Sequence, residues 1–264
     1  MDHLKVDPSP GLAGATVVNL LQRTGLRRDV LRELLGVTLL LGLAAAALGA
    51  WAGLGARYVL VALTLFGLAA TVLWRGLPWH PHARFGPANR VTLGRLAAVA
   101  LFAALSVEMA VQPLADPTRV AWSLVVLATL AAVVDAADGP LARASGLASA
   151  FGARFDMETD ALLILVLCLL IVQFGKAGPW VLAAGLMRYA FVAAAALPRW
   201  RWLNGPLPPS LRRKAVCVGL IVVLIVCLGP VIPGGMSAAL AAAGVAAVAW
   251  SFAVDIVWLA RARA

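Results

Sequence analysis

Residues 120–173 read VAWSLVVLATLAAVVDAADGPLARASGLASAFGARFDMETDALLILVLCLLIVQ. Two continuous apolar runs, near 119–135 and 159–175, flank a connection that carries four aspartates. Each run is about as long as a helix must be to cross the hydrocarbon core of a bilayer. The runs are continuous and do not alternate, which favours helices over the strands of a membrane barrel. This stretch therefore predicts two membrane helices joined by an acidic connection.

The composition of the whole chain is that of a membrane protein. Of its 264 residues, 62% are hydrophobic and only 13% are charged, whereas a soluble domain is roughly half apolar and one quarter charged. We therefore expect an all-α, polytopic membrane helix bundle. The apolar runs predict eight helices, near 34–52, 58–75, 93–112, 119–135, 159–175, 179–197, 215–232 and 237–258.

The basic residues predict the orientation of this bundle. The chain has 22 Lys and Arg against 12 Asp and Glu, a net charge of +10. With the N-terminus in the cytoplasm, 18 of the 22 lie on the cytoplasmic side, 3 lie on the opposite side and Arg188 lies inside a span. This asymmetry is what the positive-inside rule requires. We therefore expect an integral protein of a bacterial cytoplasmic membrane, with both termini and the acidic segment in the cytoplasm.

The same placement of charge indicates the bilayer as a partner and argues against nucleic acid, because the basic residues lie in short loops between apolar runs. Residues 14–35 alternate apolar and basic side chains at helical spacing, which predicts an amphipathic helix on the cytoplasmic leaflet. The alternative is a poorly ordered leader. The segment Trp79-His80-Pro81-His82 contains two possible metal ligands, but a proline-rich interfacial loop is the simpler interpretation.

The four aspartates predict a cation site. Asp135 and Asp138 are three residues apart, and Asp156 and Asp160 are four apart, so each pair lies on one helix face. Antiparallel helices would bring the four carboxylates together near the membrane surface, where uncompensated charge is costly. Mg²⁺ or Mn²⁺ prefers such oxygen ligands and leaves positions for phosphate. The alternative, salt bridges at a helix end, is disfavoured because few bases lie nearby in the sequence.

The residues around the aspartates suit a nucleotide diphosphate. Gly139, Ala142 and Gly152 remove bulk where a diphosphate would approach the backbone. Arg143 offers a fixed fork of donors for phosphate. A carboxylate that binds no metal would take the proton from an attacking hydroxyl.

The spacing of these residues resembles a known signature. The pattern Asp135-x2-Asp138-Gly139-x2-Ala142-Arg143-x8-Gly152-x3-Asp156-x3-Asp160 is similar to that of the CDP-alcohol phosphotransferase family. Pro87-Ala88-Asn89-x2-Thr92-x2-Arg95 resembles that family's entry into its first core helix. The likeness covers about residues 85–260. It implies a six-helix catalytic core at 78–264, preceded by an additional pair of transmembrane helices at 34–77 and the leader at 1–33.

The resemblance also implies roles for individual residues. Two divalent metals would be held by Asp135, Asp138 and Asp156, with Asp160 completing the site and acting as general base. The CDP site would be lined by Gly139, Ala142, Arg143 and Gly152, with Asn89, Thr92 and Arg95 at its rim. Pro140 occupies a variable position of the pattern and predicts a local kink, because it removes a helix hydrogen bond.

A second group of basic residues predicts an acceptor site. Arg188 lies within a span, and such a buried charge is a functional-site hypothesis. Arg212, Arg213 and Lys214 precede the seventh span. Together they would bind a phosphate on the acceptor alcohol. The alternatives are a structural pair of Arg188 with Glu158 or Asp160, and a membrane-anchoring role for residues 212–214. For Glu108 and Asp255 we expect structural pairing.

The sequence thus predicts a phospholipid-biosynthetic enzyme that needs Mg²⁺ or Mn²⁺. It would move a phosphatidyl-type group from a CDP-linked lipid to an alcohol, such as glycerol phosphate or inositol phosphate, and release CMP. Two alternatives stay open: transfer from a soluble CDP-alcohol to a lipid acceptor, and a cation-coupled carrier. The resemblance further implies a possible homodimer.

Overall fold

The structure, a computed structural model, describes the backbone of residues 12–144 and 146–262 and the side chains of 23–134 and 146–262. Within these ranges the protein is all-α, with no strand. The α-helices are α1 (Leu12–Ala52), α2 (Ala56–Gly76), α3 (Pro87–Val111), α4 (Pro117–Ala144), α5 (Ala150–Gln173), α6 (Leu182–Ala196), α7 (Leu211–Leu228) and α8 (Gly234–Arg261). Three short 3-10 helices are η1 (Leu77–Trp79), η2 (Pro179–Val181) and η3 (Pro198–Asn204).

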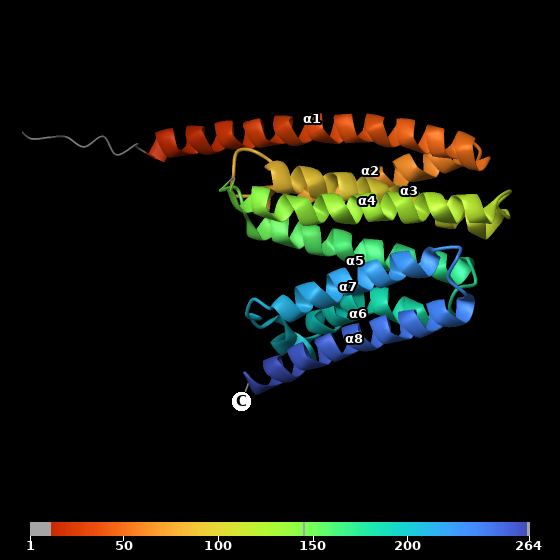
Figure 1. Cartoon of the computed structure of the whole chain (residues 1–264). Coiled ribbons are helices and arrows are strands. Elements are labelled where there is room, and N and C mark those ends of the chain that lie inside the picture. The colour runs from red at the N-terminus through yellow and green to blue at the C-terminus, as the bar shows by residue number, and fades with distance from the viewer. Residues whose placement is uncertain (1–11, 145, 263–264) are drawn as a thin grey trace, which may run out of the picture.

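The helices lie roughly side by side and alternate in direction (Figure 1). In the described part of the chain, six are long and apolar enough to cross a membrane, and they belong to α1, α2, α3, α4, α6 and α8. The other two, α5 and α7, begin with charged turns and continue as apolar helices. The prediction of an all-α polytopic membrane bundle is confirmed.

Several helices extend beyond the predicted apolar runs. α3 begins at Pro87 and not near 93, α5 begins at Ala150 and not near 159, and α4 continues through Pro140 to Ala144. A search for apolar runs stops at the first charged residues, whereas the helix continues because its backbone hydrogen bonds do not depend on polarity. Pro140 does not end α4, whose backbone stays helical to Ala144.

The predicted leader is not a separate helix. α1 is continuous over its 41 residues, from Leu12 to Ala52. The sequence offers no proline between 14 and 52 to end the helix. Residues 14–33 therefore form the first turns of the same helix that carries the first predicted span. Residues 1–11 lie outside the described residues.

α3 is the central helix of the bundle. It packs against α1, α2, α4 and α5, while α5 also packs against α6 and α7, and α7 against α4 and α8. α1 and α8 form opposite edges of the bundle (Figure 1). α3, α5 and α7 begin, and α4 ends, at one end of the bundle, at the left in Figure 1. We call this the site end.

Ion pairs and one hydrogen bond join α1 and α2 to α3 and to the residues just before it, at both ends of the bundle. At the site end, Asp29 Oδ2 accepts a hydrogen bond from the Phe85 backbone N–H at 2.9 Å, and Glu33 Oε1 lies 3.0 Å from Arg90 Nε. At the opposite end, Arg57 Nε donates to Glu108 Oε2 at 2.7 Å. Glu108 is 1% exposed. The prediction that Glu108 has a structural partner is confirmed.

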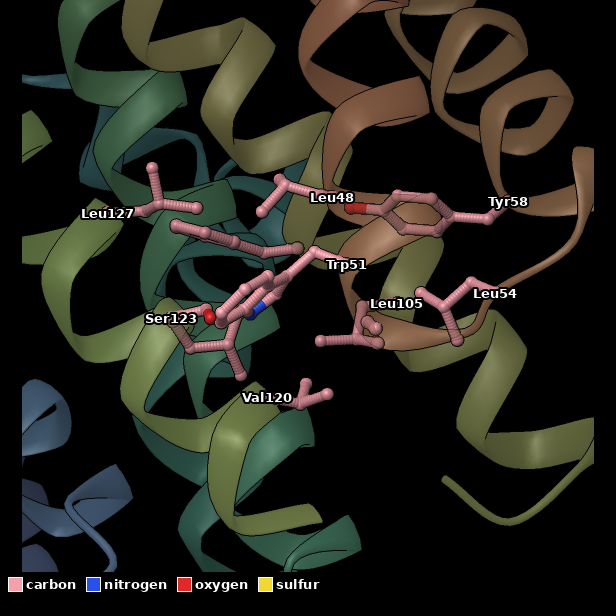
Figure 2. A pocket seen from close by; sticks show the side chains of 11 residues that line it. Leu48, Trp51, Leu54, Tyr58, Leu105, Val120, Ser123 and Leu127 are labelled. Atoms are coloured by element: carbon pink, nitrogen blue, oxygen red, sulfur yellow. The ribbon is translucent and has the colours of Figure 1, made fainter. Parts of the chain in front are cut away.

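At the end opposite the site, α1 and α2 pack closely on α3 and α4. Figure 2 shows a small cavity at the end opposite the site, where Trp51 of α1 and Tyr58 of α2 face Leu105 of α3 and Ser123 of α4. Its volume is about 30 Å³, room for little more than one water molecule. This part of the bundle is therefore packed and contains no space for a substrate.

Candidate active site

The first turns of α3 supply a buried polar face. Asn89, Thr92 and Arg95 are three residues apart and are only 4%, 5% and 4% exposed. The Asn89 amide nitrogen donates to the Phe85 carbonyl, and Thr92 Oγ1 donates to the Ala88 carbonyl at 3.1 Å. All three side chains are buried between neighbouring helices. They form the floor of the site.

Arg95 joins this floor to the acidic turns of α5. Its Nη1 atom lies 2.8 Å from Asp156 Oδ1, and its Nη2 atom contacts Asp160 Oδ1. The two aspartates are one helical turn apart and so face the same guanidinium. Few bases lie near Asp156 and Asp160 in the sequence, but the fold brings Arg95 into contact with both. Arg95 is distant in the sequence, and sequence spacing alone does not reveal the contact.

One arginine does not neutralise two carboxylates. Burial and the neighbouring Asp160 raise the pKa of Asp156 above its usual range, while Arg95 and Lys214 act in the opposite direction. Asp156 lies ahead of the apolar run of α5, and its side chain is 47% exposed. Asp156 therefore offers an accessible carboxylate beside the buried arginine.

The start of α5 is fixed by a chain of hydrogen bonds. Ser149 is the N-cap, and its Oγ accepts from the Gly152 N–H at 3.0 Å. His80 Nε2 lies 2.9 Å from the Arg84 carbonyl, and His80 Nδ1 lies 3.3 Å from Ser149 Oγ. A carbonyl only accepts, so Nε2 carries the proton and Nδ1 accepts from Ser149. Burial lowers the pKa of His80, which favours this neutral form.

Gly152 faces the α3 floor. A Cβ at this position would lie 2.7 Å from Asn89 Oδ1, closer than real contacts allow. The glycine therefore allows α5 to approach Asn89, and any larger residue would push the two helices apart. The sequence predicted glycine here as space for a nucleotide, and the structure gives it a packing role.

The remaining signature residues lie at the end of α4. Its backbone is helical through Ala144 and reaches the site end, where α4 packs against α3 and α7. α5 packs against the same two helices. The side chains of Asp135, Asp138, Gly139, Ala142 and Arg143 lie outside the described residues.

A cavity of about 410 Å³ lies beside Asp160, between α5, α6, α7 and α8. Arg188 and Arg213 line it together with Asp160 and Asp255. Arg188 Nη2 lies 2.6 Å from Glu158 Oε1, so the predicted alternative of a pair with Glu158 is present in the structure. Two of the four predicted acceptor residues thus share a cavity with Asp160.

The other two predicted acceptor residues lie elsewhere. Arg212 donates to the Ser251 carbonyl and hydroxyl, both at 2.6 Å, and pairs with Asp255. Its guanidinium is 5.5 Å from the centre of the Trp250 ring. Arg212 therefore ties α7 to α8, and the prediction that Asp255 has a structural partner is confirmed. Lys214 does not line the cavity and acts on Asp156 through its charge.

The described acids suit a divalent cation as ligands. Within 23–134 and 146–262 no cluster of three or more His, Cys, Asp or Glu is present, and the other two signature acids lie outside these ranges. Asp156 and Asp160 contribute hard oxygen donors on one helix face, and Asp156 is half exposed. This donor chemistry fits Mg²⁺ or Mn²⁺.

Three contributors were not predicted from the sequence. Ser149 has a recognisable signal, a serine directly before a helical run. His80 was assigned to a loop, and its contact with Ser149 spans 69 residues. Cys217 Sγ lies 3.8 Å from Asp160 Oδ2, and nothing in the local sequence distinguishes it from an ordinary apolar cysteine.

One comparison with known proteins gives a match. The family model of the CDP-alcohol phosphatidyltransferases matches residues 85–255, which are 171 of the 264 residues. The match begins just before α3 and ends in α8, so α1, α2 and the His80 loop lie outside it. Neither the curated proteins nor the solved structures give a match.

Proposed function

Because the chain belongs to the CDP-alcohol phosphatidyltransferase family, we propose that it transfers a phosphatidyl-type group from a CDP-linked lipid to an alcohol. The observation that carries the proposal is the Arg95–Asp156–Asp160 cluster. Its Asp160 lines a cavity together with two further arginines. The basic residues at this end support placing it in the cytoplasm.

The reaction exchanges one P–O bond for another. The acceptor hydroxyl oxygen attacks the phosphorus that carries the lipid group. The bond from that phosphorus to the bridging oxygen breaks, and CMP leaves with the bonding electrons. The hydroxyl proton passes to Asp160. Its Oδ1 atom is engaged by Arg95, and its Oδ2 atom accepts a hydrogen bond from the Cys217 thiol at 3.8 Å. A thiol is a weak donor that an acceptor hydroxyl can displace, and we therefore assign Oδ2 as the base.

Asp135, Asp138, Asp156 and Asp160 would hold two divalent cations, which when bound would neutralise the diphosphate and polarise the phosphorus. Arg95 fixes the orientation of the two described acids. The Ser149 cap and the contact between Gly152 and Asn89 hold the first turn of α5 in place. These residues therefore position the acids before substrate binds, which lowers the entropic cost of reaching the reactive geometry.

The acceptor that fits the cavity beside Asp160 is a phosphorylated alcohol. Arg188 and Arg213 line this cavity with the proposed base, and an arginine fork suits phosphate oxygens. Glycerol phosphate and inositol phosphate have the required hydroxyl and phosphate. The reverse arrangement, in which a soluble CDP-alcohol reacts with a lipid acceptor, would use the same acids. The family match gives no support to a cation-coupled carrier.

The test is CMP release by purified protein in lipid nanodiscs. The protein is incubated with CDP-diacylglycerol, Mg²⁺ or Mn²⁺, and one labelled alcohol of a panel at a time. We expect CMP and a labelled lipid in equal amounts with a phosphorylated alcohol, and no turnover in excess chelator. Asp156→Asn should abolish the reaction. The matched control is Asp116→Asn, at an exposed acid far from the site, which should retain it. Full turnover in chelator, or a lipid product only from soluble CDP-alcohols, would contradict the proposal.

A further inference from the structure

A larger cavity lies on the other side of α5. It has a volume of about 700 Å³ and lies between α2 and α5, with Leu96 of α3 as its floor. Its walls are mostly apolar and include Val72 and Leu73 of α2 and Phe151 and Phe155 of α5. α2 lies outside the family match, so this cavity exists only because of the added helices.

The cavity leads away from the acidic turns. Phe155 and Thr159 line it, while Asp156 and Asp160, the next residues in the sequence, face Arg95. The same two turns of α5 therefore separate an apolar cavity from the carboxylates. From Ala150 to Leu162 the cavity follows α5 over about 18 Å at the α-helical rise, which is more than half the thickness of the hydrocarbon core.

The charge at the site end of the cavity is positive. Arg154 and Glu158 are its charged lining residues. Glu158 is neutralised by Arg188 at 2.6 Å. Arg154 is exposed and, within the described part of the chain, forms no ion pair. An anionic group attached to an apolar chain would therefore place its charge beside Arg154 and its chain in the cavity.

The side of the cavity opposite α3 is open to the surroundings of the bundle. Val72 is 71% exposed and Trp79 is 83% exposed. In a membrane protein such apolar surface faces lipid, so a chain can enter sideways without crossing water. An apolar site with a few placed polar groups is the usual form of a ligand pocket.

We propose that this cavity binds an acyl chain of the CDP-linked lipid donor, and that α2 thereby makes the enzyme selective for donors with long chains. The inference rests on the proposed function, because the donor's diphosphate must lie at the acids of α5. It assigns to the added helices a role in substrate selection that the matched region 85–255 does not supply.

The test compares two neighbouring alanines of α2. Ala69 lines the cavity, and Ala70, which is half-buried, does not. Ala69→Phe places a ring in the cavity, whereas the matched control Ala70→Phe places the same ring outside it. kcat/KM for CMP release is measured with dioleoyl and with dihexanoyl CDP-diacylglycerol. Ala69→Phe should lose about tenfold or more with the dioleoyl donor, since every methylene kept out of an apolar site costs affinity.

With the dihexanoyl donor both variants should stay within about twofold of the wild type, because short chains leave the inner part of the cavity empty. This activity also shows that Ala69→Phe is folded. If that variant does not fold, Val72→Phe fills the same cavity near its open side and is expected to give the same pattern. Equal loss with both donors, or no loss with either, would overturn the inference. Absence of CMP release by the wild type would instead refute the proposed function.

Discussion

Arg95 Nη1 lies 2.8 Å from Asp156 Oδ1, and the same guanidinium contacts Asp160. The arginine comes from α3, the helix that opens the matched region, and the acids come from α5. A single buried cation thus sets the spacing between α3 and α5 at the level of the site. It engages Oδ1 of Asp160, whereas Oδ2 accepts a hydrogen bond from the Cys217 thiol.

Arg95→Lys tests whether this spacing matters. An ammonium is a point charge and does not hold two carboxylates in a fork geometry. We expect the free energy of unfolding to fall by about 1–3 kcal/mol, measured as a lower thermal unfolding temperature. The rate of CMP release should fall by about 10²-fold. The matched control is Arg90→Lys, on the same helix but 49% exposed and paired with Glu33, which should change both quantities little. Equal effects of the two substitutions would show that Arg95 contributes no more to stability and rate than an exposed arginine of the same helix.

The fold was largely predictable from hydropathy, but the helix ends were not. The eight apolar runs correspond to the eight α-helices of the described residues, because a helix satisfies its backbone hydrogen bonds within one continuous segment in lipid. The site lies at the polar ends of α3, α4 and α5, and the predicted apolar runs do not include these ends. Arg95 was noticed through its spacing from Asn89, yet its partners are 61 and 65 residues away. Only packing reveals such a pair. The continuity of α1 was missed for another reason: basic residues between 23 and 32 interrupt the apolar pattern, although no proline ends the helix.

The contact between His80 and Ser149 predicts a pH effect on stability. Burial lowers the pKa of His80 below the ordinary value of a histidine. Between the lowered folded pKa and the unfolded value, the unfolded chain binds more protons, so stability falls as the pH falls through this window. We expect the wild-type unfolding temperature to decrease below about pH 6.5. In His80→Gln this decrease should be smaller.

Two variants separate His80 from its surroundings. Ser149→Ala removes the cap of α5 and should cost about 0.5–2 kcal/mol at all pH values. His82→Ala removes an imidazole that packs edge-on against His80, with ring centroids 5.5 Å apart, and that also lowers the pKa of His80. This variant should therefore weaken the pH dependence without abolishing it. If His80→Gln has the same profile as the wild type, another group causes the pH dependence.

The pair of Arg57 with Glu108 predicts how the added helices are held. Glu108 is 1% exposed, and its Oε1 atom has no hydrogen-bond partner among the described residues. Arg57→Gln leaves this carboxylate without its cation and should destabilise the protein by roughly 3 kcal/mol, the lower end for a broken buried pair, because Arg57 is partly exposed. The double variant Arg57→Gln, Glu108→Gln should recover most of that loss. Arg119→Gln, at a surface pair with Asp116, is the control and should cost under about 1 kcal/mol.

Asp135 and Asp160 are predicted to fail in different ways. Asp135→Asn removes a proposed metal ligand, so metal affinity and CDP-lipid affinity should fall together. Asp160→Asn keeps an oxygen near Arg95 but removes the basic Oδ2 that borders the acceptor cavity. The donor should then still bind, while the rate falls by about 10²- to 10⁴-fold, the usual contribution of a general base.

Donor affinity and steady-state rates measured on both variants, with Asp116→Asn as control, distinguish the two roles. An equal loss of affinity in both would make Asp160 chiefly a metal ligand, and a near-normal rate in Asp160→Asn would remove it from the reaction.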